Sequence, residues 1–178
     1  MGTSQIPKGL KVRIGPDWDQ AGTFIGSGQS IAAAMQFPVV SLYNSGSASH
    51  VCNVYGFTAT QAAAGEFLTV GTFKGSIGSV VAGAAFPILP GQQPSENGDI
   101  YQGTLVPVTK HFVQGISFGM NGRADFEFFQ PFPLAVITPG FSFCVLSNQA
   151  AITLTCGFFW TETPWPVDSP PVMSFRRF

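Results

Sequence analysis

The stretch from residue 131 to residue 164, PFPLAVITPGFSFCVLSNQAAITLTCGFFWTETP, decides the fold class. It holds three apolar segments, PLAVIT, FSFCVLS and AITLTCGFFWTET, separated by Thr138-Pro139-Gly140 and by Asn148-Gln149. In the third segment, apolar residues at the even positions from 152 to 160 alternate with threonine, glycine or phenylalanine at the odd positions. Successive side chains of a strand point to opposite faces. The pattern therefore predicts a strand with one core face and one Thr-rich surface.

The rest of the chain continues this pattern of short segments. The 178 residues include 21 glycines and 14 prolines, which interrupt the sequence too often for long helices. Segments of period two recur between these breaks, as in sandwiches and barrels. We expect an all-β protein, an antiparallel β-sandwich of jelly-roll-like type with long loops. Further strands are expected at Leu10–Ile14, Val39–Tyr43, His50–Thr58, Phe67–Phe73, Ser79–Phe86, His111–Phe118 and Ala124–Phe129.

Local signals predict the connections between these strands. Asn121-Gly122 favours a two-residue hairpin turn, which joins the strand before it to the strand after it. An alanine run predicts a short helix at Thr60–Gly65, with Gly65 as its cap. We interpret the Gly-rich and Ser-rich passage Gly22–Ser30 as turns, and the prolines of Leu89–Asp99 as an exposed loop. Within His50–Thr58, Tyr55 and Phe57 are expected on one face and Cys52 and Val54 on the other.

Charged residues are scarce. The chain has 8 Lys or Arg and 9 Asp or Glu, 10% in all, against about 25% in an ordinary soluble domain. A compact monomer of 18.9 kDa exposes roughly 8,000 Å², so each charge would serve about 500 Å². Much of the surface is therefore expected to face other protein. The net charge of -1 and the lack of a basic stripe argue against direct nucleic-acid binding.

The N-terminal residues and the cysteines bear on where the protein is made. Met1–Leu10 has no charged segment followed by an apolar core, so we expect synthesis in a cytoplasm and not secretion. The longest apolar stretch, Ile77–Pro90, is broken by glycine and proline and is too short to span a membrane. Three cysteines are expected to be reduced and buried. They are Cys52, Cys144 and Cys156.

The sequence supports structural roles for its acidic residues and glycine clusters better than catalytic ones. Asp125 and Glu127 lie two residues apart, a spacing that a glycosidase could use, but they alternate with phenylalanines as a solvated strand face does. The pairs Asp17 with Asp19 and Glu96 with Asp99 fit turn-rich loops. Gly26-Ser27-Gly28 is not a nucleophile elbow, and no phosphate-binding loop is present. We therefore expect no enzyme activity and no catalytic residue.

The sequence offers few side chains for a metal or sugar site. His50 and Cys52 share a strand face, and His111 with Cys144 or Cys156 could join them, but no paired Cys or His motif supports zinc. Asp17 and Asp19 offer too few oxygens for calcium. We expect no metal and no cofactor. Sugars could stack on aromatic residues, which keeps a carbohydrate-binding module as an alternative. The candidates for such stacking are Trp18, Tyr43, Tyr55, Tyr101 and Trp165.

One resemblance is visible in the segment from residue 131 to residue 164. The order of a short apolar strand, a Pro-Gly turn, a second strand and a threonine-rich strand ending in Trp160-Thr161-Glu162 resembles virion proteins of bacteriophages and other viruses with a jelly-roll or β-sandwich domain. It covers about a fifth of the chain. The resemblance implies a role as a coat, cement or fibre component and carries over no catalytic residue.

The last residues, PWPVDSPPVMSFRRF from 164 to 178, are rich in proline and have neither helical nor strand periodicity. Proline favours an extended form that loses little entropy on docking. We expect residues 1–163 to form a single β-sandwich domain and residues 164–178 to form an extended arm that lies on a neighbouring subunit. Its expected interface residues are Trp165, Phe175, Arg176, Arg177 and Phe178.

The sequence as a whole leads to one functional expectation. We expect a structural protein of a virus particle, of the phage capsid cement or decoration type, acting by buried protein-protein area. Its expected partners are further copies of itself, with a trimer as one option, and a major capsid protein, with no nucleic acid or membrane. A major coat protein, or a component of the tail or of the receptor-binding apparatus, is the alternative within this class. A carbohydrate-binding module, and behind it a glycosidase, are the alternatives outside it.

Overall fold

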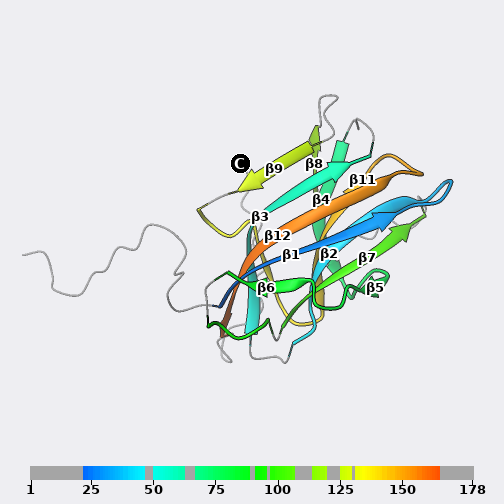
Figure 1. Cartoon of the computed structure of the whole chain (residues 1–178). Helices are drawn as coiled ribbons and strands as arrows, with labels where there is room; N and C mark the ends of the chain where they lie inside the picture. Colours follow the sequence, from blue (N-terminus) through cyan, green and yellow to red (C-terminus); the bar gives the residue numbers. More distant parts are fainter. Residues whose placement is uncertain are drawn as a thin grey trace, which may run out of the picture.

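The computed structural model describes residues 22–46, 50–62, 67–88, 91–95, 97–106, 114–119, 125–129 and 131–164. These residues form strands and their connections, with no helix among them. Two antiparallel sheets of six strands each pack face to face, so the expected β-sandwich is confirmed (Figure 1).

The two sheets have a simple strand order. The first runs β10 (Ala135–Ile137), β3 (His50–Gln61), β12 (Thr153–Pro164), β1 (Gly22–Ile31), β6 (Ala85–Pro87), and β9 (Asp125–Phe129) also pairs with β3. The second runs β5 (Ser79–Val80), β7 (Gly98–Leu105), β2 (Phe37–Asn44), β11 (Phe141–Ser147), β4 (Phe67–Lys74), β8 (Gln114–Gly119).

The pairings are nested along the chain. Strand β1 pairs with β12, β2 with β11, β3 with both β9 and β10, and β4 with β8. Three further strands, β5, β6 and β7, lie between β4 and β8 in the sequence. They extend the first sheet beyond β1 and the second sheet beyond β2. Long-range pairing of this kind means that the two ends of the described chain meet in the middle of one sheet.

Aromatic side chains fill the space between the sheets. Phe143 of β11 packs against Phe57 and Phe158 of the first sheet, with ring centroids 6.0 Å and 6.1 Å away. Phe24 stacks on Trp160 at 5.7 Å. All five side chains are at most 4% exposed. Burial of each such side chain contributes about 1.5–3 kcal/mol, so this cluster stabilises the packing of the two sheets.

Strand β12 follows the predicted alternation for most of its length. Leu154, Cys156, Phe158 and Trp160 are buried in the core, while the odd-numbered residues from 153 to 159 are half-buried on the outer face. The expected Thr-rich outer face is therefore confirmed up to Phe159. Beyond that point Thr161 is buried as well.

Strand β1 corrects the interpretation of Gly22–Ser30 as turns. This passage belongs to the ten-residue strand Gly22–Ile31, which lies in the interior of the first sheet. Its glycines permit close approach of the second sheet: a Cβ on Gly26 would lie 2.9 Å from the Ala84 carbonyl and from Ile100, and one on Gly28 would lie 2.9 Å from Ile100. The glycines of this strand leave space for the neighbouring sheet and do not form a turn.

Strand β3 corrects two further predictions. A register shift opposite Phe159 and Trp160 leaves Tyr55 as an extra residue, a β-bulge. Because the bulge reverses the alternation, Phe57 joins Cys52 and Val54 in the core instead of opposing them. The helix expected at Thr60–Gly65 is wrong at its start, since Thr60 and Gln61 continue the strand; residues 63–66 lie outside the described residues.

The predicted hairpin around Asn121-Gly122 is also wrong. Strand β8 belongs to the second sheet, where it pairs with β4, and β9 belongs to the first sheet, where it pairs with β3. The connection therefore crosses between the sheets. The single strand expected at Ser79–Phe86 is two short strands, β5 and β6, in different sheets. Strand β7 was not expected at all.

Candidate interaction surface

An apolar row crosses the outer face of the first sheet. Phe86 of β6 lies opposite Ile25 of β1, Ile25 opposite Phe159 of β12, Phe159 opposite Gly56 of β3, and Gly56 opposite Phe129 of β9. Cross-strand partners share a face. We call Phe86, Ile25, Phe159 and Phe129 the apolar row.

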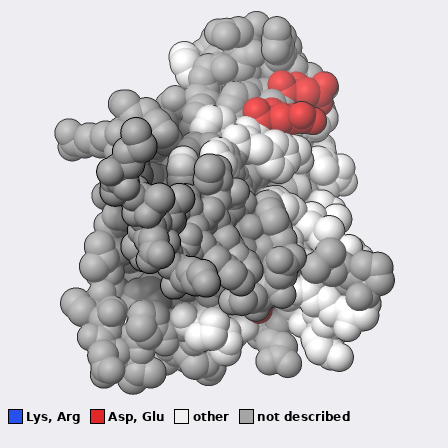
Figure 2. Space-filling view, turned by 90° about the vertical axis from the view of Figure 1, so that its left-hand side faces the viewer, with Lys and Arg blue, Asp and Glu red and all other residues white. Residues whose placement is uncertain are grey.

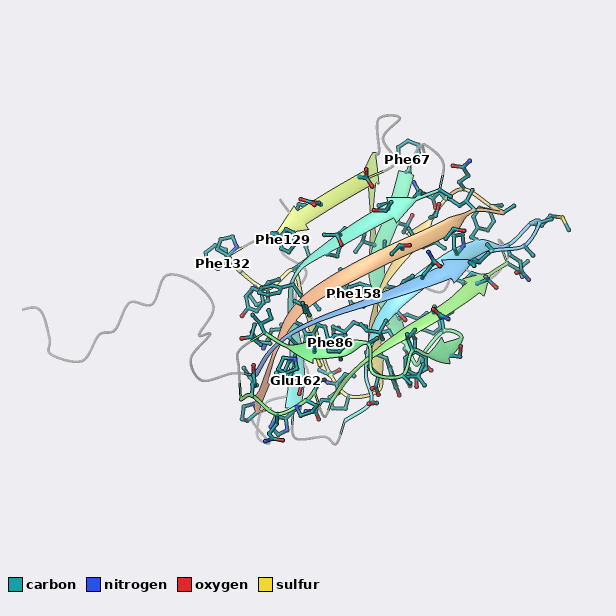
Figure 3. The ribbon with its side chains drawn as sticks, viewed as in Figure 1. Phe67, Phe86, Phe129, Phe132, Phe158 and Glu162 are labelled. Carbon is teal, nitrogen blue, oxygen red and sulfur yellow. The ribbon has the colours of Figure 1, made fainter. Side chains whose placement is uncertain are left out.

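The apolar row is accessible on the described surface. Phe86 and Phe129 are each 57% exposed and Ile25 is 47% exposed, whereas Phe159 is half-buried. Figure 3 shows Phe86 and Phe129 at opposite sides of the sheet, with β1, β12 and β3 between them. The Phe129 ring leans over Gly56, where a Cβ would lie 2.2 Å from it, and meets Phe159 edge-on at 6.3 Å. A contiguous exposed apolar strip of this kind marks an interaction site more often than scattered exposed residues do.

The second sheet differs on its outer face. Val39, Cys144 and Leu146 point away from the main core but are fully buried, because the connection after β4 brings Ile77 over them. Gly78 lies so close to Gln102 and Gly103 that a Cβ would be 2.0 Å from the Gln102 carbonyl oxygen. The chain thus covers the apolar outer face of one sheet with its own loop, whereas the apolar row of the other sheet stays exposed.

The described charges are few and mostly acidic. They are Lys74, Asp99, Asp125, Glu127 and Glu162. Asp125 and Glu127 lie two residues apart on β9 and are exposed, as the expected solvated strand face requires. They share the outer face with Phe129, so they border the apolar row. Figure 2 shows acidic side chains gathered in one corner of the visible surface, with no described Lys or Arg in that view.

A buried carboxylate, Glu162, organises one end of the sandwich. Its oxygens accept hydrogen bonds from Ser95 Oγ at 2.5 Å, Asn97 Nδ2 at 2.8 Å, the Gly98 amide at 3.1 Å and Trp160 Nε1 at 3.3 Å. Hydrogen bonds to a charged acceptor are among the stronger ones in proteins. In the sequence Glu162 is visible only as part of the Trp160-Thr161-Glu162 motif, because three of its four partners come from a distant loop and leave no local signal.

This network corrects the prediction that all of Leu89–Asp99 is an exposed loop. Asn97 is 7% exposed, and Gly98 and Asp99 already belong to β7. Gly98 packs against the Trp160 indole, where a Cβ would lie 2.7 Å from Nε1. A hollow of about 300 Å³ with both polar and apolar walls lies beside Glu162, lined by His50, Gln92, Gln93 and Asn97 among others. Both Glu162 oxygens are engaged by donors that hold the loop, which favours a structural role for this carboxylate.

The three cysteines are free and buried, as expected. Burial raises the pKa of Cys144 to about 12, although the neighbouring Ser41 hydroxyl acts in the opposite direction. Burial also raises the pKa of Cys156, and burial with the nearby charges of Glu162 and Asp99 raises that of Cys52. Neutral, inaccessible thiols are poor nucleophiles and poor metal ligands. No group of metal-binding side chains is found among the described residues.

The other predicted site residues are placed as follows. The arm residues Trp165, Phe175, Arg176, Arg177 and Phe178 lie outside the described residues, as do Trp18, Asp17, Asp19, Glu96 and His111. Among the proposed sugar-stacking residues, Tyr55 is buried, while Tyr43 and Tyr101 are half-buried and meet edge-on at 5.4 Å.

Comparison of the chain with models of protein families, with curated proteins and with solved structures finds no match. In the part of the chain that is described, no helix is long and apolar enough to cross a membrane.

Proposed function

We propose that the sandwich is a jelly roll. Its eight principal strands form two four-stranded sheets, β1-β12-β3-β9 and β2-β11-β4-β8. The nested pairing of β1 with β12, β2 with β11, β3 with β9 and β4 with β8 is what results when one long antiparallel hairpin is rolled up. Jelly rolls of eight strands are found in viral capsid and lectin domains. The β5 to β7 region is an insertion that widens both sheets on the same side.

We propose that the protein is a structural component of a virus particle, of the capsid cement or decoration type. The observation that carries this proposal is the apolar row, exposed across the outer face of the first sheet. Low charge and the jelly-roll strand order support it. The partners are other copies of this chain and a major capsid protein. Interfaces of about 800 Å² per partner, repeated over several neighbours, bind tightly without a catalytic residue or cofactor.

Two measurements test this function. Particles purified from the native source and analysed by mass spectrometry and electron microscopy should contain the chain in a symmetric lattice. In solution, light scattering should show an oligomer, and replacing Ile25 and Phe129 with serine should shift it toward monomer without loss of folding. Ile31→Ser, which replaces an exposed isoleucine of β1 outside the apolar row, is the matched control. A wild-type chain that is monomeric at all concentrations and absent from particles would overturn the proposal.

A component of the tail or of the receptor-binding apparatus is the alternative within the same class. The position of the chain in the particle, on the capsid or on the tail, distinguishes this alternative from the cement role. A carbohydrate-binding module is the second candidate, favoured by the half-buried pair Tyr43 and Tyr101 on the second sheet. Glycan binding that is lost in Tyr101→Ala, by a chain absent from particles, would favour that candidate over the virion role.

A further inference from the structure

The apolar row borders a hollow on the outer face of the first sheet. Gly157 forms its floor, because a glycine leaves space where its cross-strand neighbours Ser27 and Thr58 carry side chains. Ile25, Phe86, Phe129 and Phe159 surround it, and its volume is about 300 Å³. The hollow is therefore apolar, open and large enough for aromatic rings.

Acidic groups lie at one side of this hollow. Glu127 is the cross-strand partner of Thr58, which lines the hollow. Asp125 lies two residues before Glu127 on the same face of β9. Both carboxylates are exposed, and no Lys or Arg of the described residues lies on β9 or the strands beside it. A ligand that fits should therefore combine aromatic rings with positive charge.

The chain itself contains such a segment. Phe175-Arg176-Arg177-Phe178 places two arginines between two phenylalanines, close after Pro170 and Pro171. In the polyproline II form that neighbouring prolines favour, residues three apart lie on the same side, about 9 Å from each other. Both phenylalanine rings can then face one surface while the arginines point to the sides.

We propose that the segment Phe175–Phe178 of a second copy binds this hollow, with its phenylalanines on the apolar row and its arginines at Asp125 and Glu127. This inference rests on the proposed oligomeric role and names the acceptor site for the arm.

The direction of β12 favours a second copy over the same chain. Gly157 lies seven residues before Pro164, about 24 Å along the strand. From Pro164 to Phe175 an extended Pro-rich chain covers about 34 Å. An extended segment of this length, if continued in the direction of β12, would place Phe175 far from the hollow of its own chain. A return to that hollow requires a reversal that four prolines between residues 164 and 171 oppose.

Cysteine crosslinking in the full chain tests the contact. One preparation carries Glu127→Cys and another carries Arg177→Cys; the native cysteines are fully buried and stay unreactive. On mixing and mild oxidation we expect a disulfide-linked pair of the two chains. Lys74→Cys, exposed on the second sheet, replaces Glu127→Cys in the control and should crosslink at least tenfold less. A chain with both substitutions that crosslinks only within itself would overturn the proposal.

Substitutions in the arm and beside the hollow test the contribution of each to association. Phe178→Ala should weaken association about tenfold, the loss typical of a buried aromatic anchor. Glu127→Arg should weaken it by up to about fivefold, and Arg177→Glu in the same chain should restore it. Light scattering distinguishes the two hypotheses: an oligomer that persists without crosslinking and without response to Phe178→Ala overturns the arm contact but leaves the oligomeric role standing. A wild-type monomer overturns both.

Discussion

Asn97 donates a hydrogen bond of 2.8 Å from its side-chain amide to the carboxylate of Glu162, and both side chains are at least nine-tenths buried. The contact joins residues 65 positions apart and fastens the loop before β7 to the end of β12. Phe86, Phe129 and Ile25 of the apolar row, by contrast, are 57%, 57% and 47% exposed. The polar network thus holds two distant segments together, whereas the apolar row is the surface that we propose for association.

Glu162→Gln should destabilise the fold by about 1–3 kcal/mol. In the neutral amide an NH₂ group replaces one of the two oxygens and faces either the Asn97 amide or the Ser95 and Gly98 donors, so at least one hydrogen bond becomes a donor-donor clash. Urea denaturation measures the change in the free energy of unfolding. Glu127→Gln, on an exposed strand face, is the control and should change it by no more than about 0.5 kcal/mol. Equal effects of the two substitutions would contradict the role given to Glu162.

Gly26→Ala should cost about 1–3 kcal/mol, although alanine is usually a harmless replacement in a strand. The added methyl would lie 2.9 Å from both the Ala84 carbonyl oxygen and Ile100, so the sheets would have to separate locally. Thermal unfolding followed by circular dichroism tests this. Ser27→Ala, one residue further along β1 on the exposed face, should leave the melting temperature nearly unchanged.

Phe143→Ala should cost about 3–5 kcal/mol, because it opens a cavity between Phe57 and Phe158. Phe86→Ala removes the same ring from an exposed position and should cost less than about 1 kcal/mol while reducing association. Chemical denaturation and light scattering on both variants separate the two outcomes. A large stability loss in Phe86→Ala would mean that the apolar row belongs to the core.

Stability should fall as the pH rises above about 8.5. The pKa of each buried thiol is raised in the folded state, so each contributes stability that is fully present below the pKa of the unfolded thiol. That contribution is lost as the pH rises toward the folded pKa, about 12 for Cys144. Cys144→Ala should therefore reduce the slope of unfolding free energy against pH by about 1.4 kcal/mol per pH unit between pH 9.5 and 11. An unchanged slope would show that this thiol ionises in the folded protein.

Alternation and turn residues were sufficient to predict the strands from residue 131 to residue 164, because period two and Pro-Gly breaks are local properties. The same reasoning placed Cys156, Phe158 and Trp160 on one buried face. It failed at Gly22–Ser30, because glycine signals a turn locally whereas here it allows two sheets to approach. It failed again at Tyr55, since a bulge depends on the register with the neighbouring strand.

The features of the candidate site also fall into those that the sequence determines and those that depend on tertiary structure. The amino-acid sequence alone determined that the protein is β-rich, poor in charge and rich in phenylalanine, since these are matters of composition and local period. Only the tertiary structure decided that Phe86, Ile25, Phe159 and Phe129 meet in one row, and that Ser95, Asn97 and Gly98 surround Glu162. Contacts between residues many positions apart depend on strand order and register, and no short segment specifies either by itself.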